Sequence, residues 1–230
     1  MRIYLGQIGS YTYLIPLVAA LYNHRALSKP LRLLGIYAGA TLAESLYMLY
    51  VASSGEYNLW VVHLFTPLEA FLFLWMFSQW QLRESARMAM LIAIPLYFAI
   101  WGVLHLTVEP LSAFPVYSKP VECMLLVGAA AYTLVTRSQT LLTPAIRHPW
   151  FLVSVGTMMY FSFVTVLQPM AQMLMGRNDL LIIAFEMNAA MGILANFLFA
   201  WALLCPSPHP SSGGSFSPPP SSAAFSQPPS

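Results

Sequence analysis

Seven long apolar stretches constrain the fold of this chain more than any other feature of its sequence. A helix needs about 20 mostly apolar residues to cross a bilayer, with a range of about 17–25. Inside lipid such a stretch must satisfy its own backbone hydrogen bonds, which a helix does. The sequence therefore predicts an all-α, polytopic transmembrane bundle of seven helices. The predicted spans are residues 8–23, 31–52, 58–80, 86–107, 120–136, 150–172 and 180–204.

The composition leaves no room for a soluble domain. Charged residues make up 8% of the chain and hydrophobic residues 58%, whereas a soluble domain carries about 25% charged residues. No segment between the spans exceeds about a dozen residues, which is too short for an independently folded unit. The net charge of +2 comes without a Lys/Arg cluster, so no nucleic-acid partner is expected. The predicted partner is the lipid bilayer.

The distribution of cations between the loops predicts the orientation. The loops after the first, third and fifth spans carry most of the cations, while the opposite loops carry only Arg2, Lys119 and Arg177. Cytoplasmic loops are enriched in Lys and Arg, so the N-terminus is expected outside and the C-terminus in the cytoplasm. The larger set of cations comprises Arg25, Lys29, Arg32, Arg83, Arg87, Arg137 and Arg147.

The C-terminal residues 205–230 differ in composition from the rest of the chain. They are rich in proline and serine and hold too little apolar surface to fold, which predicts a disordered tail. The tail is either a docking segment for a proline-binding protein or dispensable, and composition alone favours the second interpretation. Cys123 and Cys205 are expected near opposite membrane faces, too far apart to form a disulfide.

Ionisable side chains inside the spans are the strongest functional signal. An ionised group at the bilayer centre costs about 2.5–3.5 kcal/mol on insertion scales, so such groups are expected to face the bundle interior. In the predicted topology all of them lie between the midplane and the outer face, which predicts a polar cavity on that side. Glu69, Glu44, His63 and Glu186 are the candidates for ligand or proton handling. The full set is Glu44, His63, Glu69, His105, Glu122 and Glu186.

Several of these groups also have structural explanations. Glu122 lies at a predicted helix start and is interpreted as complementing the helix dipole. His63 is suited to a hydrogen bond with a backbone carbonyl. His105 and Glu109 have the four-residue spacing of helical metal ligands, but they lie near water, so a solvated pair is preferred. The sequence therefore predicts no metal site, no cofactor and no catalytic residue.

Small and amide-bearing residues in the last span predict helix packing. Asn188, Gly192 and Asn196 are spaced by four residues and share one helix face. Small residues permit close approach of helices, and amides form hydrogen bonds across the contact. Gly35 and Gly39 form a similar pair in the second span.

Two stretches resemble uncharacterised seven-helix proteins of the bacterial inner membrane. The first runs from Asn58 to Glu69 and contains His63, with Phe65 where a tyrosine is typical. The second is His148-Pro149-Trp150-Phe151, followed by Tyr160-Phe161. The resemblance implies a multi-pass protein of the bacterial cell membrane but no activity, and it draws attention to His63 and Glu69.

Three functions remain open at this point. The first is a sensor or accessory protein that holds a ligand in the outer cavity and acts through a cytoplasmic or membrane partner protein. The second is a proton-coupled transporter of small solutes, with Glu69 and Glu44 as the relay, although the inner half of the bundle has few polar side chains. The third is an intramembrane metal-dependent hydrolase, which ranks last because no H-E-x-x-H motif is present. A retinal pigment is excluded, because the only lysines are Lys29 and Lys119.

Overall fold

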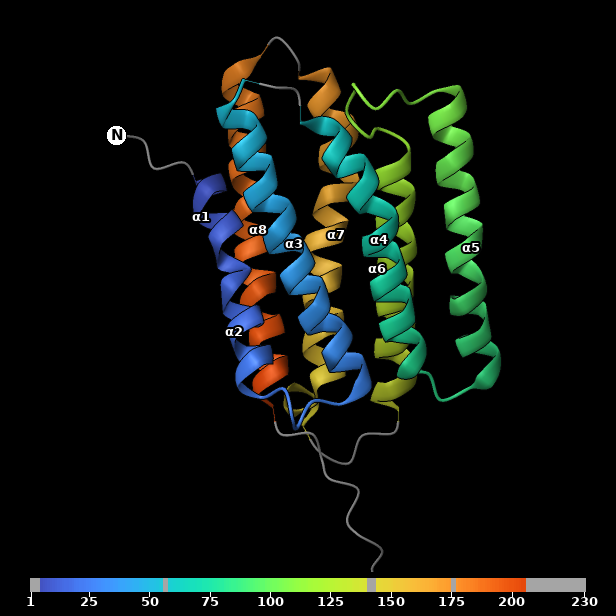
Figure 1. The fold of residues 1–230 in the computed structure, drawn as a ribbon. Helices are drawn as coiled ribbons and strands as arrows, with labels where there is room; N and C mark the ends of the chain where they lie inside the picture. Colours follow the sequence, from blue (N-terminus) through green and yellow to red (C-terminus); the bar gives the residue numbers. More distant parts are fainter. Residues whose placement is uncertain (1–4, 56–57, 140–143, 175–176, 206–230) are drawn as a thin grey trace, which may run out of the picture.

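The structure is a computed structural model that describes residues 5–55, 58–139, 144–174 and 177–205. All regular structure in these residues is helical, and no strand occurs among them. The chain runs up and down as seven rods, the first of which is a broken helix (Figure 1). The elements are α1 (Leu5–Thr12), α2 (Leu14–Tyr22), α3 (Lys29–Ser53), α4 (Leu59–Gln79), α5 (Glu84–Thr107), α6 (Ser118–Ser138), the short 3-10 turn η1 (Ala145–Arg147), α7 (Pro149–Met173) and α8 (Asn178–Leu204). The predicted disordered tail lies, apart from Cys205, outside the described residues.

Five of the helices, α4 to α8, are long and apolar enough to cross a membrane by length and composition. The α1–α2 rod is apolar but shorter. Helix α3 has 25 residues but is less apolar, because it carries Thr41, Glu44 and Ser45 in its second half. The apolar helices are compatible with an integral membrane protein, as the composition predicts.

The break between α1 and α2 follows from Pro16. Proline has no backbone N–H, so it cannot donate to the carbonyl of the residue four positions earlier, which here is Thr12. Helix α1 ends at that residue and α2 begins two residues later. Tyr13, at the break, lines the interior of the bundle. The proline therefore places a tyrosine at a discontinuity beside the main cavity.

Six rods form a closed ring and the seventh lies outside it. The ring runs from α1–α2 through α3, α4, α6, α7 and α8, and each rod packs on the next. Helix α5 packs mainly on α4 and lies at the edge of the bundle (Figure 1). Only Met90 and Tyr97 are buried on α5. Helix α5 is therefore held by fewer buried side chains than the ring helices α3, α4, α6 and α7.

The apolar core fills the half of the bundle that carries Arg25, Arg83 and Arg147, called here the basic end. Aromatic rings pack edge to face within it, with the centroids of Phe73 and Phe161 5.3 Å apart. Phe77, on the same helix as Phe73, is fully buried. This packing leaves polar interior surface in the other half, called here the opposite end, where α3 ends and α4 begins.

The contact between α2 and α3 depends on a small residue. A Cβ atom at Gly35 would lie 2.8 Å from the Cβ of Ala20. We expect Gly35→Val to lower the free energy of unfolding by about 1–3 kcal/mol, because overpacking forces the helices apart. Gly102→Val is the matched control, since a Cβ there meets no atom within 4 Å. Thermal unfolding in detergent measures both; equal midpoints would contradict this packing.

Candidate functional site

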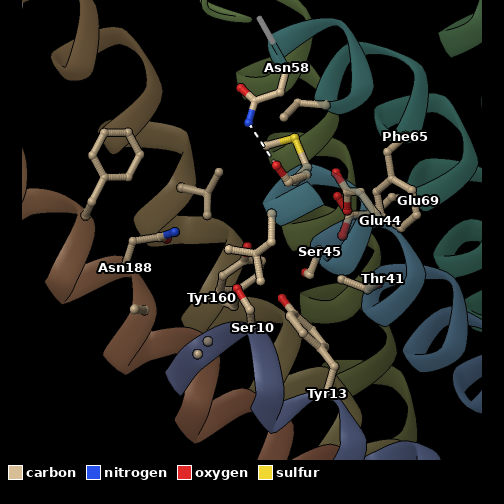
Figure 2. Close-up of a pocket in the computed structure, with 18 of the residues that line it drawn as sticks. Ser10, Tyr13, Thr41, Glu44, Ser45, Asn58, Phe65, Glu69, Tyr160 and Asn188 are labelled. Carbon is tan, nitrogen blue, oxygen red and sulfur yellow. Dashed lines mark hydrogen bonds between the residues drawn. The ribbon is translucent and has the colours of Figure 1, made fainter. Parts of the chain in front are cut away.

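A cavity of about 450 Å³ lies inside the ring, in the opposite half of the bundle. Residues of α1, α3, α4, α6, α7 and α8 line it, together with Tyr13 and Asn58. It extends from Glu69 and Lys119, deep in the bundle, to Ala52 in the last turn of α3. Figure 2 shows Glu44 and Glu69 on one side of this space, with Asn188 reaching in from α8 on the other.

The deep end of the cavity is a buried cluster of charged groups centred on Lys119. The Lys119 ammonium forms an ion pair with Glu69 of α4, and it lies 2.8 Å from the Glu122 carboxylate in its own helix. Lys119 and Glu69 are 7% and 4% exposed, and Glu122 is fully buried. The ammonium also lies 5.8 Å from the centroid of the Phe161 ring. Through its ion pair with Glu69, Lys119 thereby connects the start of α6 to the middle of α4.

The two predicted acids of the cavity have different surroundings. Both oxygens of Glu69 are used: Oε1 accepts a hydrogen bond of 2.8 Å from the Tyr37 hydroxyl, and Oε2 accepts from Lys119. Glu44 is half-buried on α3 and lines the same cavity. No side chain in the described ranges forms a hydrogen bond or ion pair with Glu44. The structure therefore places Glu69 in the framework and leaves the Glu44 carboxylate directed to the cavity.

The rest of the lining supplies acceptors and aromatic rings. Oε1 of Gln168 and Oδ1 of Asn188 are buried and have no hydrogen-bond partner among the described residues. Phe65 and Tyr160 contribute ring surface from α4 and α7. The charged groups near the cavity are the acids Glu44, Glu69 and Glu122 against the single cation Lys119. The cavity is consequently rich in hydrogen-bond acceptors, with more carboxyl groups than cations around it.

The other two candidates, His63 and Glu186, do not line this cavity. Glu186 is half-buried on α8. His63 is fully buried on the far side of α4, where its Nε2 donates a 2.8 Å hydrogen bond to the carbonyl of Ala113. Its ring contacts that of His105, with a centroid separation of 4.6 Å. Glu44 and Glu69 thus line the cavity, whereas His63 lies beside α5 and Glu186 lies elsewhere on α8.

The predicted packing residues of α8 have two kinds of surroundings. Asn196 is buried and its Nδ2 donates a 2.9 Å hydrogen bond to the Thr12 hydroxyl of α1. Asn188 and Gly192 line the cavity. A Cβ at Gly192 would lie 3.5 Å from the Tyr160 ring, an ordinary contact. On α8, Asn196 therefore packs against α1, whereas Asn188 and Gly192 border the cavity.

The interpretation of His105 and Glu109 as a solvated pair is wrong. Glu109 is 3% exposed, and its carboxylate accepts the backbone amides of Tyr117 and Ser118 at 2.9 Å and 3.3 Å. These amides belong to the start of α6, where the first N–H groups lack helical partners. Glu109 therefore caps α6 from the preceding segment, and it does not face water.

Lys119 lies in the interior, whereas the sequence predicts a loop position for it, because Ser118-Lys119-Pro120 is typical of a helix start. Helix α6 does begin there, but its first turn is buried. Two signals pointed to the pairing: Lys119 and Glu122 have the three-residue spacing of helical ion pairs, and a deep acid such as Glu69 requires a partner.

The basic end of the bundle is closed by hydrogen bonds between helices. Nε2 of Gln81 donates to the Thr133 hydroxyl at 2.8 Å, and Nε of Arg137 donates to the carbonyl of Trp80 at 2.6 Å. Nδ2 of Asn23 donates to the carbonyl of Leu203 at 3.0 Å. Together with the aromatic core, these contacts separate the cavity from the basic end.

Comparison with known proteins identifies no relative of this chain: no protein-family model, curated protein or solved structure matches it. A function can therefore be inferred only from the geometry of the described residues.

Proposed function

We propose that this protein is a membrane sensor or accessory protein whose cavity binds a small organic cation. The observation that carries the proposal is the Glu44 carboxylate, which lines the cavity and has no partner among the described side chains. A volume of about 450 Å³ lies within the range of about 300–1,000 Å³ that is usual for small-molecule sites.

The lining supports a cation with N–H donors. Glu44 offers a carboxyl group, and Asn188 and Gln168 offer amide oxygens that are otherwise unpaired. An ammonium group forms charge-assisted hydrogen bonds with such acceptors. It is also attracted to aromatic faces such as those of Phe65 and Tyr160. An anionic ligand would meet an excess of carboxylates and is disfavoured.

The closed half of the bundle supports binding over transport. A transporter needs a path to both membrane faces. Between the cavity and the basic end, however, the interior is filled by buried apolar side chains such as Phe73, Phe77 and Leu203. No described segment forms an output domain of its own. We therefore propose that ligand binding changes the packing of the helices and that a cytoplasmic or membrane partner protein responds at the basic end.

The distribution of cations supports the predicted orientation. Burial of Lys119 in the ion cluster removes one cation from the loops of the opposite end. The excess of cations at the basic end is then larger than the sequence count indicated. By the positive-inside rule we propose that the basic end is cytoplasmic and that the cavity receives its ligand from outside the cell.

Glu44→Gln tests the proposed ligand class. We expect butylammonium to raise the thermal unfolding midpoint of the purified protein, while butyrate of the same chain length does not. The amide keeps the size of the side chain but loses its charge, so we expect about tenfold or greater loss of butylammonium affinity. Thermal shift and tryptophan fluorescence titrations measure both quantities.

The matched control is Glu186→Gln, which removes an acid from the bundle without altering the cavity lining. We expect it to bind butylammonium as the parent protein does. Equal binding of butyrate, or unchanged butylammonium affinity in Glu44→Gln, would contradict the proposed function.

A further inference from the structure

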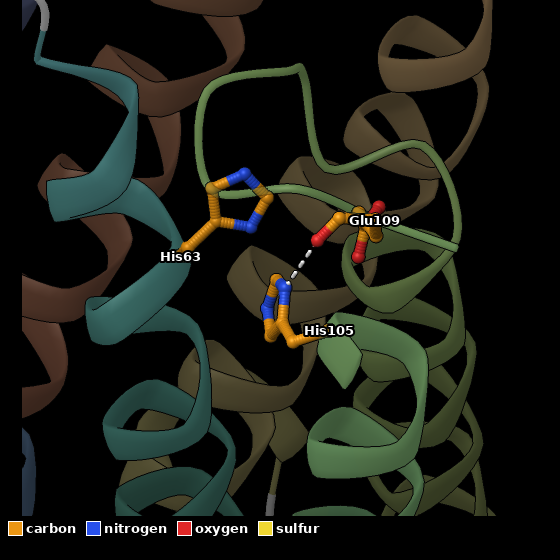
Figure 3. A group of neighbouring side chains, drawn as sticks. All are labelled: His63, His105 and Glu109. Atoms are coloured by element: carbon orange, nitrogen blue, oxygen red, sulfur yellow. Dashed lines mark hydrogen bonds between the residues drawn. The ribbon is translucent and has the colours of Figure 1, made fainter. Parts of the chain in front are cut away.

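A second cluster of donor groups lies outside the cavity, on the face of α4 that carries α5. It consists of His63 of α4, His105 of α5 and Glu109 of the segment after α5 (Figure 3). One donor atom from each residue lies within 4.8 Å of the other two. His63 and Glu109 are buried, and His105 is half-buried. The three residues come from three separate elements of the chain.

The hydrogen bonds of the two histidines fix which ring nitrogens are available. Nε2 of His63 bonds to the carbonyl of Ala113, and Nδ1 of His105 bonds to the backbone carbonyl of Glu109, both at 2.8 Å. A carbonyl oxygen only accepts, so these nitrogens carry the protons. In each neutral ring the other nitrogen then presents a lone pair.

Those lone pairs lie on buried atoms without a protein partner. Nδ1 of His63 and Nε2 of His105 form no hydrogen bond with any described residue. Two buried acceptors without donors are costly unless another group satisfies them. Histidines that bind metals have this arrangement, in which the second ring nitrogen donates to a carbonyl or carboxylate and so orients the ring.

Glu109 completes the donor set. Its carboxylate accepts backbone amides at the start of α6, yet an ionised carboxylate has about four acceptor positions. At least one oxygen lone pair therefore remains for a cation. The carboxylate also supplies negative charge that offsets part of the charge of a divalent ion.

We propose that His63, His105 and Glu109 bind a divalent transition-metal ion of the zinc type. Two imidazole nitrogens and one carboxylate oxygen suit such ions, whereas magnesium and calcium prefer oxygen donors alone. Bonds of about 2.0–2.2 Å place tetrahedral ligands about 3.4 Å apart. One ligand atom of each residue already lies within 4.8 Å of the others, so binding of an ion requires the three side chains to move closer together.

The surroundings assign this ion a structural role. His63 is fully buried and Glu109 nearly so, which leaves a substrate no access to the site. The ion joins α4 to α5, the helix outside the ring. It also joins both helices to Glu109, whose carboxylate accepts the backbone amide of Ser118, the residue before Lys119. It therefore fastens α5 to the bundle. This inference is independent of the proposed function, because the ligand cavity lies elsewhere.

Two substitutions remove the ligands but keep the hydrogen bonds. His63→Gln places an amide nitrogen where Nε2 donates to Ala113. His105→Asn places one where Nδ1 donates to the Glu109 carbonyl. The full chain, purified in detergent with a tag that contains no histidine, is titrated with Zn²⁺ and with Mg²⁺. We expect about one Zn²⁺ per chain and a rise of about 5–10 °C in the unfolding midpoint at 100 times the dissociation constant. Magnesium is expected to have neither effect.

In each variant we expect at least about tenfold weaker zinc binding and loss of the zinc-dependent rise. His24→Ala is the control, because His24 is exposed in the turn after α2 and should leave zinc binding unchanged. The proposal is overturned if the parent chain binds no zinc, or if His63→Gln and His105→Asn bind zinc as tightly as the parent.

Discussion

Replacement of Lys119 by methionine is expected to lower the free energy of unfolding by about 3–5 kcal/mol, the cost of leaving a buried charge without its partner. Methionine matches the four-atom stem of the lysine side chain and lacks only the ammonium group, so the change removes charge with little change in packing. Glu69 and Glu122 then face each other in the interior without a cation. Titration of the purified protein with a denaturing detergent, followed by tryptophan fluorescence, measures the loss.

The matched test neutralises the whole cluster. A triple variant that combines Lys119→Met, Glu69→Gln and Glu122→Gln contains no buried charge at this position. Because a neutral interior avoids desolvation of ions, we expect the triple variant to be more stable than Lys119→Met alone. Parent-like stability of Lys119→Met, or a triple variant no more stable than the single one, would show that the acids do not depend on Lys119.

The helices could be predicted because lipid imposes a length requirement that is visible in a single sequence. The predicted span 58–80 corresponds to α4 at Leu59–Gln79, and the span 150–172 to α7 at Pro149–Met173. The break at Tyr13 could not be predicted from the length of the span 8–23, although that span contains Pro16. A proline removes a hydrogen bond from a residue four positions earlier, so the effect on the chain appears away from the proline itself.

The cavity could be predicted only in part. Burial cost identified Glu44 and Glu69 as interior groups, and both line it. The same argument included His63 and Glu186, because depth along a helix does not specify the face on which a residue lies. The contacts of His63 with Ala113 and His105 depend on how the segment after α5 folds back. That path is not encoded in a local pattern of the sequence.

Lys119 shows the limit of assigning residues to loops by type. A lysine next to a proline at a helix start resembles a loop residue, but the helix start itself is buried here. Glu109, Ser118 and Lys119 form one connected unit, since Glu109 accepts the Ser118 amide and Lys119 pairs with Glu69. Such a unit brings together segments about ten to fifty residues apart, which spacing rules do not reach.

Cations are expected to reach the cavity from outside the cell much faster than anions do. Ser45 lines the cavity on α3, one residue from Glu44. Ser78 is fully buried on α4 in the closed half. Both are serines on helices, so Ser45→Cys and Ser78→Cys are equivalent chemical changes at positions with different access. The native Cys123 and Cys205 are free and buried, and the parent chain labelled in parallel measures their background.

The most direct measurement is the rate at which impermeant methanethiosulfonates, one with a trimethylammonium group and one with a sulfonate, modify these cysteines from outside intact cells. We expect the cationic reagent to modify Ser45→Cys about tenfold or more faster than the anionic one, because Glu44 attracts positive charge. We expect neither reagent to modify Ser78→Cys. Equal rates for the two reagents at Ser45→Cys, or modification only from the cytoplasmic side, would contradict an outward cavity for cations.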